Sequence, residues 1–553
     1  MKQYTDMDEA AREVFTVAKL LHWQRVSIAN TLAGKRQIVI LPTGYGKSLC
    51  FLVPAVMLPG VTLIIYPLLA LMKDQKRRMD ASALHAVVLK GGQTKKERDD
   101  AFLRISQGKA RVIIANPEIL LVPAVLHRLG ACNISHIAID EAHCVSEWGE
   151  SFRPAYTKLG DIIARLGVQR VTALTATASP PVLERIQTLL FETSACVSTH
   201  NSPHMRRIHS SPRAEIVRGN LDRPNIHYRV RYAAAKRPAL LSEVLKAEKP
   251  CVVFCSTRKL SEEHARMLSA YFQAQAPEDQ CPVRFYHAGM TKPEKKAIED
   301  WFFASKNGVL CCTSAYGMGV DKSDIRTCIH AESPSKIEFF IQEAGRAGRD
   351  KKAAHSVLLW SSVDKRHFPA LAGYAHTTRC RRQFLLDYLD GEQATCSGCD
   401  ICEQEAKAQE NANSNARTST KHAQSLLAAT KNVRTENATT QEADSAQILQ
   451  WIQKNRLRYR EEDAVSLLQD EMNKSEKNGT DHVWELQDIR TVLAALKDEK
   501  KIQTRLGKLS TVNARRTKKL LTRLPHRQRH QLHRLRRQIR QLAQGLERLQ
   551  QIF

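Results

Sequence analysis

A short glycine-rich stretch near the start of the chain restricts its fold more than any other feature. The mostly apolar run Gln37–Leu41 before the stretch is typical of a buried strand, and the run Leu49–Val53 after it is typical of the start of a helix. A strand, a glycine turn and a helix in this order form a phosphate cradle, because backbone N–H groups and the helix dipole converge on an anion. The stretch between the two runs contains Thr43, Gly44, Gly46, Lys47 and Ser48.

The residues of this loop predict a nucleotide site. Lys47 would reach the β- and γ-phosphates of a nucleotide, and Ser48 would hold Mg²⁺. The backbone around Thr43, Gly44 and Gly46 would surround the phosphates. The glycine spacing departs from the standard pattern, which has a further glycine two positions before Thr43. A glycine turn without function is the alternative for this stretch alone.

A second stretch supplies the acidic partner that such a loop requires. The apolar run Ile137–Ile139 ends in Asp140 and Glu141. Asp140 would hold Mg²⁺, and Glu141 would polarise the water that attacks the nucleotide. A solvated acidic turn is the alternative, but two carboxylates directly after a buried strand favour the catalytic interpretation. The two stretches together predict a nucleoside triphosphatase.

Short apolar runs alternate with helical stretches in two successive parts of the chain. This rhythm predicts parallel sheets with helices on both faces, and it places functional residues at the carboxyl ends of the strands. The sequence therefore predicts an α/β fold with two lobes, each built around one parallel sheet. The runs are 61–65, 112–115, 134–140 and 171–175 in the first lobe and 251–255, 309–313 and 327–331 in the second.

The most informative residues of the second lobe lie in the stretch 342–350. Arg346 and Arg349 are three residues apart, so that on one helical face both would reach a phosphate cluster. An arginine held there would stabilise the charge on the transferred phosphoryl group, and such arginines are worth roughly 10³–10⁵ in rate. Gln342 would contact the attacking water or the γ-phosphate. A salt-bridged helix without a catalytic role is the alternative.

The loop at Lys47 and the acidic stretch at Asp140 together resemble those of a superfamily 2 helicase. The segment 144–156, which is rich in aromatic residues, narrows the resemblance to the RecQ family, and the similarity covers roughly residues 14–402. It implies two tandem RecA-like lobes with ATP between them, a small zinc-binding helical subdomain, and a mostly helical, basic C-terminal region. It also implies an ATP-dependent DNA helicase that moves 3′ to 5′ and acts in recombination, repair and replication.

The resemblance implies further site residues. Gln24 matches the family's adenine-reading glutamine, but Leu21–Trp23 stand where the family has Phe-Arg-Pro, so the nucleotide selectivity stays open. Gly319 and Asp321 lie in a segment that touches both DNA and nucleotide in the family. Rings that stack on bases and cations that meet phosphates are implied for DNA binding, with packing of the rings in the core as the alternative. These DNA contacts are Lys73, Trp148, Phe152 and Arg153.

Four of the fourteen cysteines form a pattern. Their spacing, C-x15-C-x2-C-x2-C, suits a closed tetrahedral Zn²⁺ site, and iron–sulfur ligation is the alternative that the spacing leaves open. The resemblance to the RecQ zinc subdomain favours structural zinc. The scattered remaining cysteines indicate reduced thiols in a reducing compartment. The four ligands are Cys380, Cys396, Cys399 and Cys402.

Composition and motifs together divide the chain into seven parts. A plain helical bundle is the alternative for the sixth part. We find no good candidate for the family's strand-separating hairpin or for its usual small C-terminal helical domain, and both absences put efficient unwinding in doubt. The parts are an ATP-binding lobe (1–200), a linker (201–217), a second helicase lobe (218–376), a zinc-binding subdomain (377–403), a flexible linker (404–443), a winged-helix-like module (444–505) and a basic helical tail (506–553).

The net charge of +27 predicts a polyanionic partner. We expect single-stranded and forked DNA, together with ATP. The tail 506–553 carries 13 Lys and Arg residues against one acidic residue, so its basic face would contact phosphates without sequence preference. Its segment 532–553 has an apolar heptad seam, which would pair with a partner helix, self-associate or pack back on the protein.

The sequence contains no apolar run long enough for a membrane span, and its start does not resemble a secretory leader. We therefore expect no membrane partner and a protein that is not secreted, located with the nucleoid in a bacterial cytoplasm or in a eukaryotic nucleus. Two alternatives to a helicase stay open: a nucleic-acid-stimulated ATPase or translocase that unwinds weakly, and a non-enzymatic DNA-binding scaffold. Intact Lys47, Asp140, Glu141, Arg346 and Arg349 argue against the scaffold.

Overall fold

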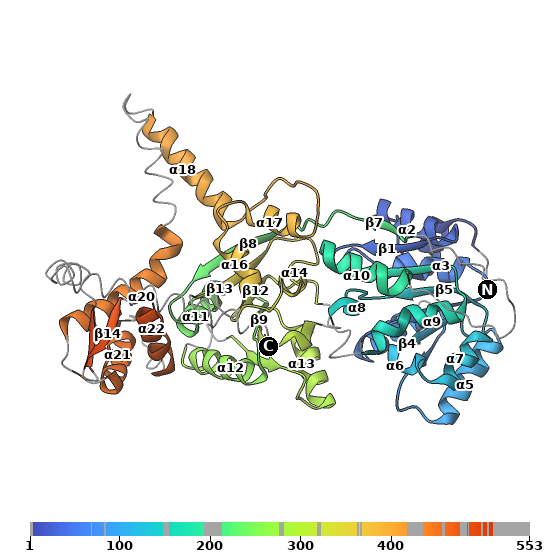
Figure 1. The fold of residues 1–553 in the computed structure, drawn as a ribbon, viewed down its shortest axis with the longest axis horizontal. Helices are drawn as coiled ribbons and strands as arrows, with labels where there is room; N and C mark the ends of the chain where they lie inside the picture. Colours follow the sequence, from blue (N-terminus) through green and yellow to red (C-terminus); the bar gives the residue numbers. More distant parts are fainter. Residues whose placement is uncertain are drawn as a thin grey trace, which may run out of the picture. The chain divides into compact units, whose positions relative to one another are not determined.

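The structure is a computed structural model, and it divides into two compact units, Met1–Ala438 and Thr439–Phe553. The first unit contains two parallel sheets, and the second contains helices and one hairpin (Figure 1). The structure describes residues 4–67, 69–81, 84–147, 154–192, 213–275, 281–317, 322–361, 364, 368–416, 435–455, 459, 461–475, 484, 486–498, 501–505 and 508–511.

The first sheet has seven parallel strands in the order β3-β4-β2-β5-β6-β1-β7. Parallel neighbours require crossover connections, which helices supply here, so the sheet is covered on both faces. The four predicted strands of this lobe are all present. The strands are β1 (Arg36–Ile40), β2 (Val61–Ile65), β3 (Ala86–Leu89), β4 (Val112–Ala115), β5 (Ile134–Ile139), β6 (Val171–Thr175) and β7 (Glu215–Arg218).

Two apolar cores enclose this first sheet. Ile38 and Leu63 point into one core, whereas the next residues along the same strands, Val39 and Ile64, point into the other. Successive side chains of a strand face opposite sides, and so continuous apolar runs fill both cores. The helices are α1 (Met7–Phe15), α2 (His22–Leu32), α3 (Leu49–Met57), α4 (Leu69–Ala81), α5 (Lys95–Ser106), α6 (Pro117–Leu120), α7 (Pro123–Gly130), α8 (Cys144–Glu147), the 3₁₀ helix η1 (Pro154–Lys158), α9 (Leu159–Leu166) and α10 (Pro180–Phe191).

Strand β7 lies partly within the segment 201–217, which we expected to be a linker. It pairs in parallel with β1, and the N–H of Gly219 then donates to the backbone oxygen of Ile40 at 2.9 Å. Residues 215–217 therefore complete the edge of the first sheet. The Ser-, His- and Arg-rich composition that suggested a linker belongs to residues 199–211, which lie outside the described residues.

The second sheet has six parallel strands in the order β10-β11-β9-β12-β13-β8. The three predicted strands of this lobe form its centre. The strands are β8 (Ile226–Tyr232), β9 (Cys251–Phe254), β10 (Val283–Tyr286), β11 (Val309–Cys312), β12 (Thr327–His330) and β13 (Ala354–Trp360). The helices of this lobe are α11 (Lys236–Lys246), α12 (Arg258–Gln273), α13 (Lys292–Ala304), the 3₁₀ helix η3 (Ser314–Gly317) and α14 (Ile337–Ala344).

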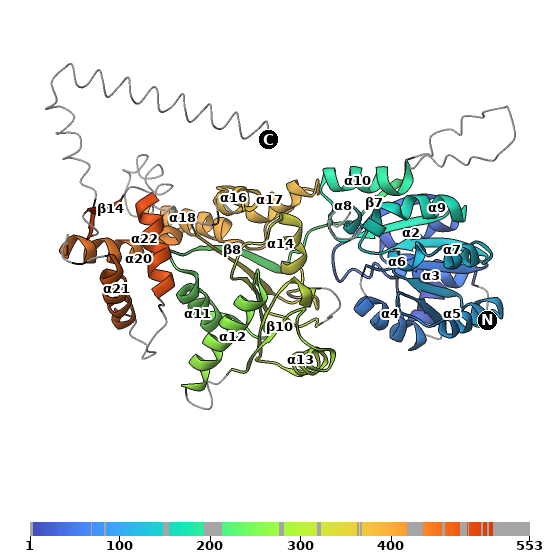
Figure 2. The ribbon, with the colours of Figure 1, turned by 60° about the horizontal axis from the view of Figure 1, so that its bottom comes forward.

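Three further helices follow the second sheet: α16 (Pro369–His376), α17 (Arg381–Tyr388) and α18 (Asp400–Ala416). Apolar residues of α14, α16 and α17 form one core with β8 and β13, and Figure 2 shows these helices gathered on one side of β8. Helix α18 continues to Ala416, although we expected a flexible linker from residue 404. The Ala, Glu, Gln and Lys residues that lower hydrophobicity there are also strong helix formers.

In the described part of the second unit, three helices are followed by an antiparallel hairpin. The last described pair of the hairpin joins Arg505 to Lys508. It joins residues on both sides of the boundary that we expected between 505 and 506, while the rest of the predicted tail, 512–553, lies outside the described residues. The elements are α20 (Thr435–Lys454), α21 (Glu461–Ser475), α22 (Leu486–Asp498), β14 (Ile502–Arg505) and β15 (Lys508–Thr511).

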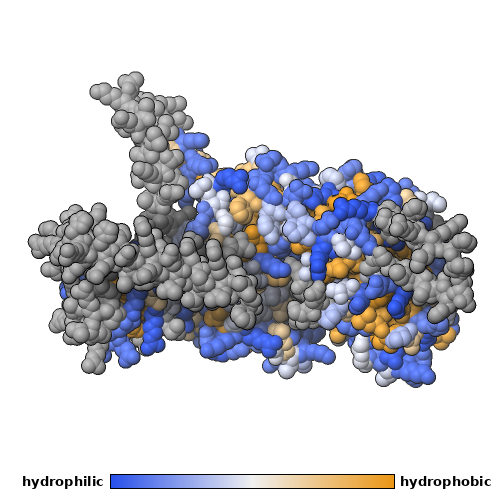
Figure 3. Space-filling view, viewed as in Figure 1, coloured by the Kyte–Doolittle hydropathy of each residue, from blue (hydrophilic) through white to orange (hydrophobic). Residues whose placement is uncertain are grey.

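On the face drawn in Figure 3 the coloured residues are mostly hydrophilic, with an apolar area over the first lobe near α6. Leu121 and Val122, which follow α6, are 46% and 40% exposed. A cavity of about 560 Å³ lies between α6, α7 and α9. Within the described ranges, every helix is too short or too polar to cross a membrane.

Candidate active site

The phosphate loop lies between β1 and α3, where the sequence predicts it. Gly44 and Gly46 have φ angles of +85° and +67°, a left-handed conformation that glycine adopts at low cost. A Cβ atom on Gly46 would also lie only 2.7 Å from Nε2 of Gln24. The loop therefore requires glycine at both positions for its conformation, and at Gly46 for space as well.

Gln24 is buried against this loop. Its side-chain amide donates to the backbone oxygens of Tyr45 at 3.0 Å and Gly46 at 3.2 Å. Its Oε1 accepts a hydrogen bond from the N–H of Leu21 at 2.8 Å, which fixes the start of α2. The structure thus brings the predicted adenine-reading residue to the phosphate loop, and its contact with adenine stays a prediction.

Lys47 and Asp140 come close enough for their charges to interact. Nζ of Lys47 donates to the backbone oxygen of Leu41 at 3.3 Å. Burial and, second, the neighbouring Glu141 carboxylate raise the pKa of Asp140 to about 7, while the Lys47 ammonium opposes the rise. A bound divalent cation would stabilise the ionised form of such a buried carboxylate. This site therefore fits Mg²⁺, with Ser48 as the second predicted protein ligand.

Glu141 occupies a strained position directly after β5. Its φ angle is +50°, in the left-handed region that glutamate seldom adopts. Such a conformation costs about 1–3 kcal/mol and is frequent at active sites. The side chain is 30% exposed, and its Oε2 lies 3.3 Å from Nδ1 of His143. The strained turn thus places two partly buried carboxylates, those of Asp140 and Glu141, next to each other at the end of β5.

A series of hydrogen bonds runs from His143 to the second lobe. Nε2 of Gln342 donates to Oγ1 of Thr177 at 2.7 Å and to Nε2 of His143 at 3.2 Å. Because Nε2 of His143 accepts, its proton is assigned to Nδ1, which lies 3.0 Å from Oγ1 of Thr175. Burial lowers the pKa of His143, which agrees with a neutral ring. Gln342 therefore lies against the end of β6 and the acidic stretch, and its contact with water or phosphate stays a prediction.

The two candidate arginines follow α14 rather than lie on it. The helix ends at Ala344, and Gly348 has a φ angle of +56°, so residues 345–350 form successive turns. The expectation that Arg346 and Arg349 share a helical face was therefore wrong. Gly348 explains part of the difference, because its left-handed conformation does not continue a helix. We call Gly345–Arg349 the arginine segment.

The arginine segment nevertheless places positive charge beside the phosphate loop. A Cβ atom on Gly44 would lie 3.8 Å from Cγ of Arg349. Burial and, second, the Arg349 charge lower the pKa of Arg346 to about 10. Nε of Arg346 is buried and has no hydrogen-bond partner among the described residues. An unsatisfied buried donor on a cation suits an anionic ligand such as a phosphate oxygen.

The four predicted zinc ligands come together. Their Sγ atoms all lie within 4.8 Å of one another, and a tetrahedral centre with Zn–S bonds of about 2.3 Å requires sulfur atoms about 3.8 Å apart. Cys380 is the N-cap residue of α17, and Cys402 lies on α18. Cys399 forms an isolated β-bridge with Tyr228 of β8. This set of four thiols fits Zn²⁺.

Several predicted site residues cannot be placed in this geometry. Lys73 belongs to α4, but its side chain is not among those described. The other residues of this group lie outside the described residues, and their roles stay predictions. They are Trp148, Phe152, Arg153, Gly319 and Asp321.

Two contacts at the site involve residues for which the sequence predicted no contact. Thr175 and Thr177, whose segment resembles the one that links hydrolysis to strand separation in the RecQ family, connect β6 to Gln342. Arg223 donates to the backbone oxygen of Thr43 at 3.3 Å. No local signal identifies Arg223, because its partners are remote in sequence.

Three family models match the chain. The model described as "DEAD/DEAH box helicase" matches residues 22–186, and "Helicase conserved C-terminal domain" matches residues 235–351. The model described as "RecQ zinc-binding" matches residues 335–403. These ranges correspond to the first sheet, the second sheet and the four-cysteine subdomain.

The chain is similar to curated helicases from bacteria and animals. It is 38% identical over 364 residues to the probable ATP-dependent DNA helicase RecS of Bacillus subtilis (strain 168), covering 65% of this chain and 68% of that protein. It is 33% identical over 412 residues to the ATP-dependent DNA helicase RecQ of Pasteurella multocida (strain Pm70), covering 70% and 61%. For the bifunctional 3′-5′ exonuclease/ATP-dependent helicase WRN of Mus musculus the identity is 31% over 394 residues, covering 66% and 26%.

Solved structures of helicases share the fold. The DUF1998 helicase MrfA bound to DNA has a TM-score of 0.55 at 14% identity, covering 93% of this chain and 63% of that one. Mss116p bound to single-stranded RNA and AMP-PNP has a TM-score of 0.51 at 16% identity, covering 70% and 81%. At these identities the likeness shows the two-lobed fold alone.

Proposed function

Because the chain belongs to the RecQ family of ATP-dependent DNA helicases, we propose that it moves 3′ to 5′ along DNA and separates the strands of forked and single-strand-tailed duplexes. One observation carries this proposal: the phosphate loop and the arginine segment, which belong to different lobes, are in contact. Oγ1 of Thr43 donates to the backbone oxygen of Gly345 at 3.1 Å. A nucleotide held from both lobes would couple its hydrolysis to their relative motion.

The cofactors are ATP, Mg²⁺ and Zn²⁺. In the proposed mechanism the loop around Lys47 binds the phosphates, while Ser48 and Asp140 hold Mg²⁺. The bound ion would neutralise charge that develops on the phosphates. Glu141, which is partly exposed, positions and polarises the attacking water.

The second lobe contributes the remaining positive charge in this proposal. Arg346 and Arg349 stabilise the charge on the transferred phosphoryl group. Gln342 senses the state of the site, because its amide joins the lobes through Thr177 and His143. Gly319 and Asp321 would complete the contacts to nucleotide.

We propose that DNA binds the first lobe through Lys73, Trp148, Phe152 and Arg153, and that residues 444–511 form a winged-helix-like module. The doubt about efficient unwinding rested in part on the lack of a hairpin candidate, and we propose β14–β15 as that candidate. No observation favours the weak translocase or the scaffold. The proposed cellular setting is recombination, repair and replication, in the compartment that holds the DNA.

Replacing Lys47 tests the active motor. We expect Lys47→Ala to lower DNA-stimulated ATP turnover by about 10²-fold or more, because the loop loses the cation that reaches the phosphates. The control is Lys35→Ala, an exposed lysine just before β1 that pairs with Glu215. Phosphate release is measured with and without single-stranded DNA. Turnover in Lys47→Ala equal to that of the control would contradict the proposal.

Strand displacement tests direction and substrate together. Duplexes of DNA with a 3′ tail, with a 5′ tail or with a fork are compared with the same duplexes made of RNA. We expect ATP-dependent displacement of the 3′-tailed and forked DNA and none of the 5′-tailed DNA. Hydrolysis without displacement would instead support a translocase.

A further inference from the structure

Arg223 connects the phosphate loop to the arginine segment. Its Nη1 donates to the backbone oxygens of Thr43 at 3.3 Å and Gly345 at 3.0 Å. Its Nη2 donates to the backbone oxygens of Ala347 at 2.9 Å and Gly348 at 3.1 Å. One guanidinium thus holds one carbonyl of the first lobe and three of the second.

The positions of these carbonyls suggest what Arg223 does. Gly345 and Ala347 flank Arg346, and Gly348 directly precedes Arg349, so Arg223 holds the backbone on which both candidate catalytic arginines are carried. Burial lowers the pKa of Arg223, and within the described part of the chain it forms no ion pair with a carboxylate. Its charge is therefore shared among backbone oxygens, for which the planar fork of arginine is suited and the point charge of lysine is not.

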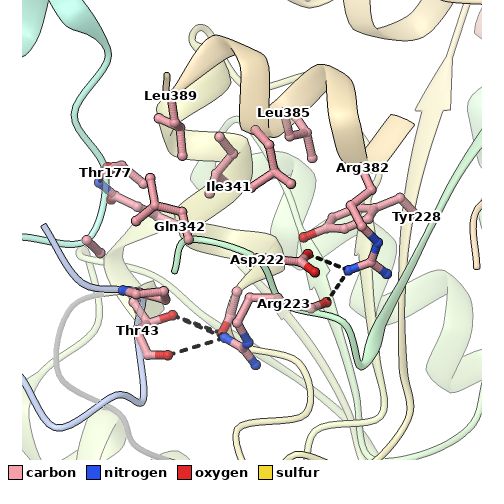
Figure 4. Close-up of a pocket in the computed structure, with 15 residues that line it drawn as sticks. Thr43, Thr177, Asp222, Arg223, Tyr228, Ile341, Gln342, Arg382, Leu385 and Leu389 are labelled. Atoms are coloured by element: carbon pink, nitrogen blue, oxygen red, sulfur yellow. Dashed lines mark hydrogen bonds and ion pairs between the residues drawn. The ribbon is translucent and has the colours of Figure 1, made fainter. Parts of the chain in front are cut away.

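A second arginine holds the segment that carries Arg223. Arg382, on α17 of the zinc-binding subdomain, is 1% exposed at its side chain. Its Nη1 donates to Oδ1 of Asp222 at 2.7 Å and to the backbone oxygen of Arg223 at 2.6 Å. Its Nη2 donates to the backbone oxygen of Ile226 and to Oγ of Ser397, both at 2.8 Å. Figure 4 shows Arg382, Asp222, Arg223 and Thr43 in succession.

Little space separates these parts of the molecule. The cavity between the phosphate loop, α14, α17 and the segment 221–223 measures only about 40 Å³, enough for a few water molecules. Thr43 and Thr177 of the first lobe line it together with Gln342 of α14 and Leu385 of α17 (Figure 4). A shift of α17 is therefore transmitted to its neighbours by direct contact, because close-packed interiors resist compression.

We propose that Arg382 and Arg223 form a relay through which the zinc-binding subdomain positions the arginine segment against the phosphate loop, and so sets the rate of ATP hydrolysis. This inference rests on the proposed function of Arg346 and Arg349. Arg223 and Arg382 are positioning residues. They act through the backbone of the arginine segment.

Lysine substitutions test the relay in the full chain. Arg223→Lys and Arg382→Lys keep the charge and remove the fork. We expect each to lower kcat for DNA-stimulated ATP hydrolysis by roughly 10- to 100-fold, the scale of a displacement of about 1 Å at a catalytic group. KM for ATP should change by less than about threefold, because the contribution of the arginines is largest in the transition state.

The control is Arg231→Lys. Arg231 is also poorly exposed, and it also donates to a backbone oxygen, that of Ala239, as well as to Glu243, but it lies outside the relay. We expect its kcat to equal that of the unmodified protein. Zinc content and the thermal midpoint are measured for every variant. If Arg382→Lys loses zinc, Asp222→Asn replaces it as the test, because it weakens the same contact without altering α17.

A combined substitution separates positioning from general destabilisation. If Arg223 acts by placing Arg346 and Arg349, then adding Arg223→Lys to the pair Arg346→Ala and Arg349→Ala should slow hydrolysis no further than that pair alone. If the effects of the combined substitutions on the rate multiply, the relay is overturned. It is also overturned if kcat in Arg382→Lys stays within twofold of that of the unmodified protein. If the unmodified protein itself showed no DNA-stimulated hydrolysis, the proposed function would fail instead, so the two failures are distinguishable.

Discussion

The hydroxyl group of Thr177 forms one of the hydrogen bonds between the two lobes. It accepts a hydrogen bond from Gln342 at 2.7 Å, and the same amide donates to His143, which lies beside Glu141. Glu141, which would activate water, is thus connected to the second lobe through the side chains of His143 and Gln342. A change at the nucleotide can therefore reach α14 through polar contacts between adjacent side chains.

Thr177→Val tests this link. Valine keeps the shape and removes the acceptor, so we expect DNA strand separation to slow by about 3- to 10-fold, the effect of one hydrogen bond of ~1 kcal/mol. ATP turnover should fall less, because the groups that would bind the phosphates are unchanged. Both rates are measured on the same 3′-tailed duplex.

Thr62→Val is the matched control for this prediction. Thr62 is also buried, on β2, but its hydroxyl has no hydrogen-bond partner among the described residues. Its removal should leave both rates unchanged. If Thr177→Val lowers the two rates equally, the hydroxyl supports the chemistry and does not couple it to motion.

Site residues were predictable where a local pattern carries the chemistry. Lys47 ends the glycine loop that follows β1, and Asp140 stands directly after β5; the parallel sheet brings such positions to one edge. The strained φ of Glu141 has no sequence signal, because glutamate is not a residue that indicates a left-handed conformation. Arg223 was missed because its partners Gly345 and Gly348 are more than 120 residues away.

At the scale of elements, the strands followed the sequence closely. The apolar runs 61–65, 112–115 and 171–175 are the strands β2, β4 and β6 with the same bounds. Strand β7 was missed because only pairing with β1 makes it a strand, and its side chains are half exposed. The polar composition of α18 likewise led us to predict a flexible linker from residue 404, although residues that lower hydrophobicity also favour helix.

The zinc-binding subdomain is held by buried charges as well as by its metal site. Arg381 pairs with Asp400, and Asp400 accepts the N–H of Val230 in β8 at 2.9 Å. Both charged side chains are 4% exposed, so each depends on the other to be stable in the interior. Four thiolates alone would repel one another, and a cation is required to hold them together.

Replacing one ligand tests the metal. We expect Cys396→Ser to lower the zinc content from about one per chain towards zero and to lower the thermal midpoint, because metal binding contributes to folding. Cys281→Ser is the control, since Cys281 is also partly exposed but lies in the second lobe outside the four-cysteine cluster. Metal analysis of the purified protein decides between zinc and iron. Iron with visible absorbance would instead establish the iron–sulfur alternative.

At the scale of the whole molecule, charge is distributed unevenly. Residues 512–553 contain 12 Lys and Arg residues and one Glu, a net charge of +11 out of +27. The hairpin shows where a truncation should be made, because β15 ends at Thr511 and pairs with β14. Removing 512–553 spares the hairpin, whereas a cut at 506 would remove one of its strands.

We expect the truncated protein to bind duplex DNA more weakly and with a flatter dependence on salt. For each phosphate that the protein no longer neutralises, the slope of log K against log salt concentration becomes less negative by about 0.9. The matched variant keeps the tail and replaces Leu535, Leu542 and Leu549 of the apolar seam with serine, which leaves the charge unchanged. If the tail binds phosphates, this variant retains the slope, and its mass in solution reports whether the seam pairs with a second helix. Should the truncated protein keep both affinity and slope, the basic tail does not contact DNA.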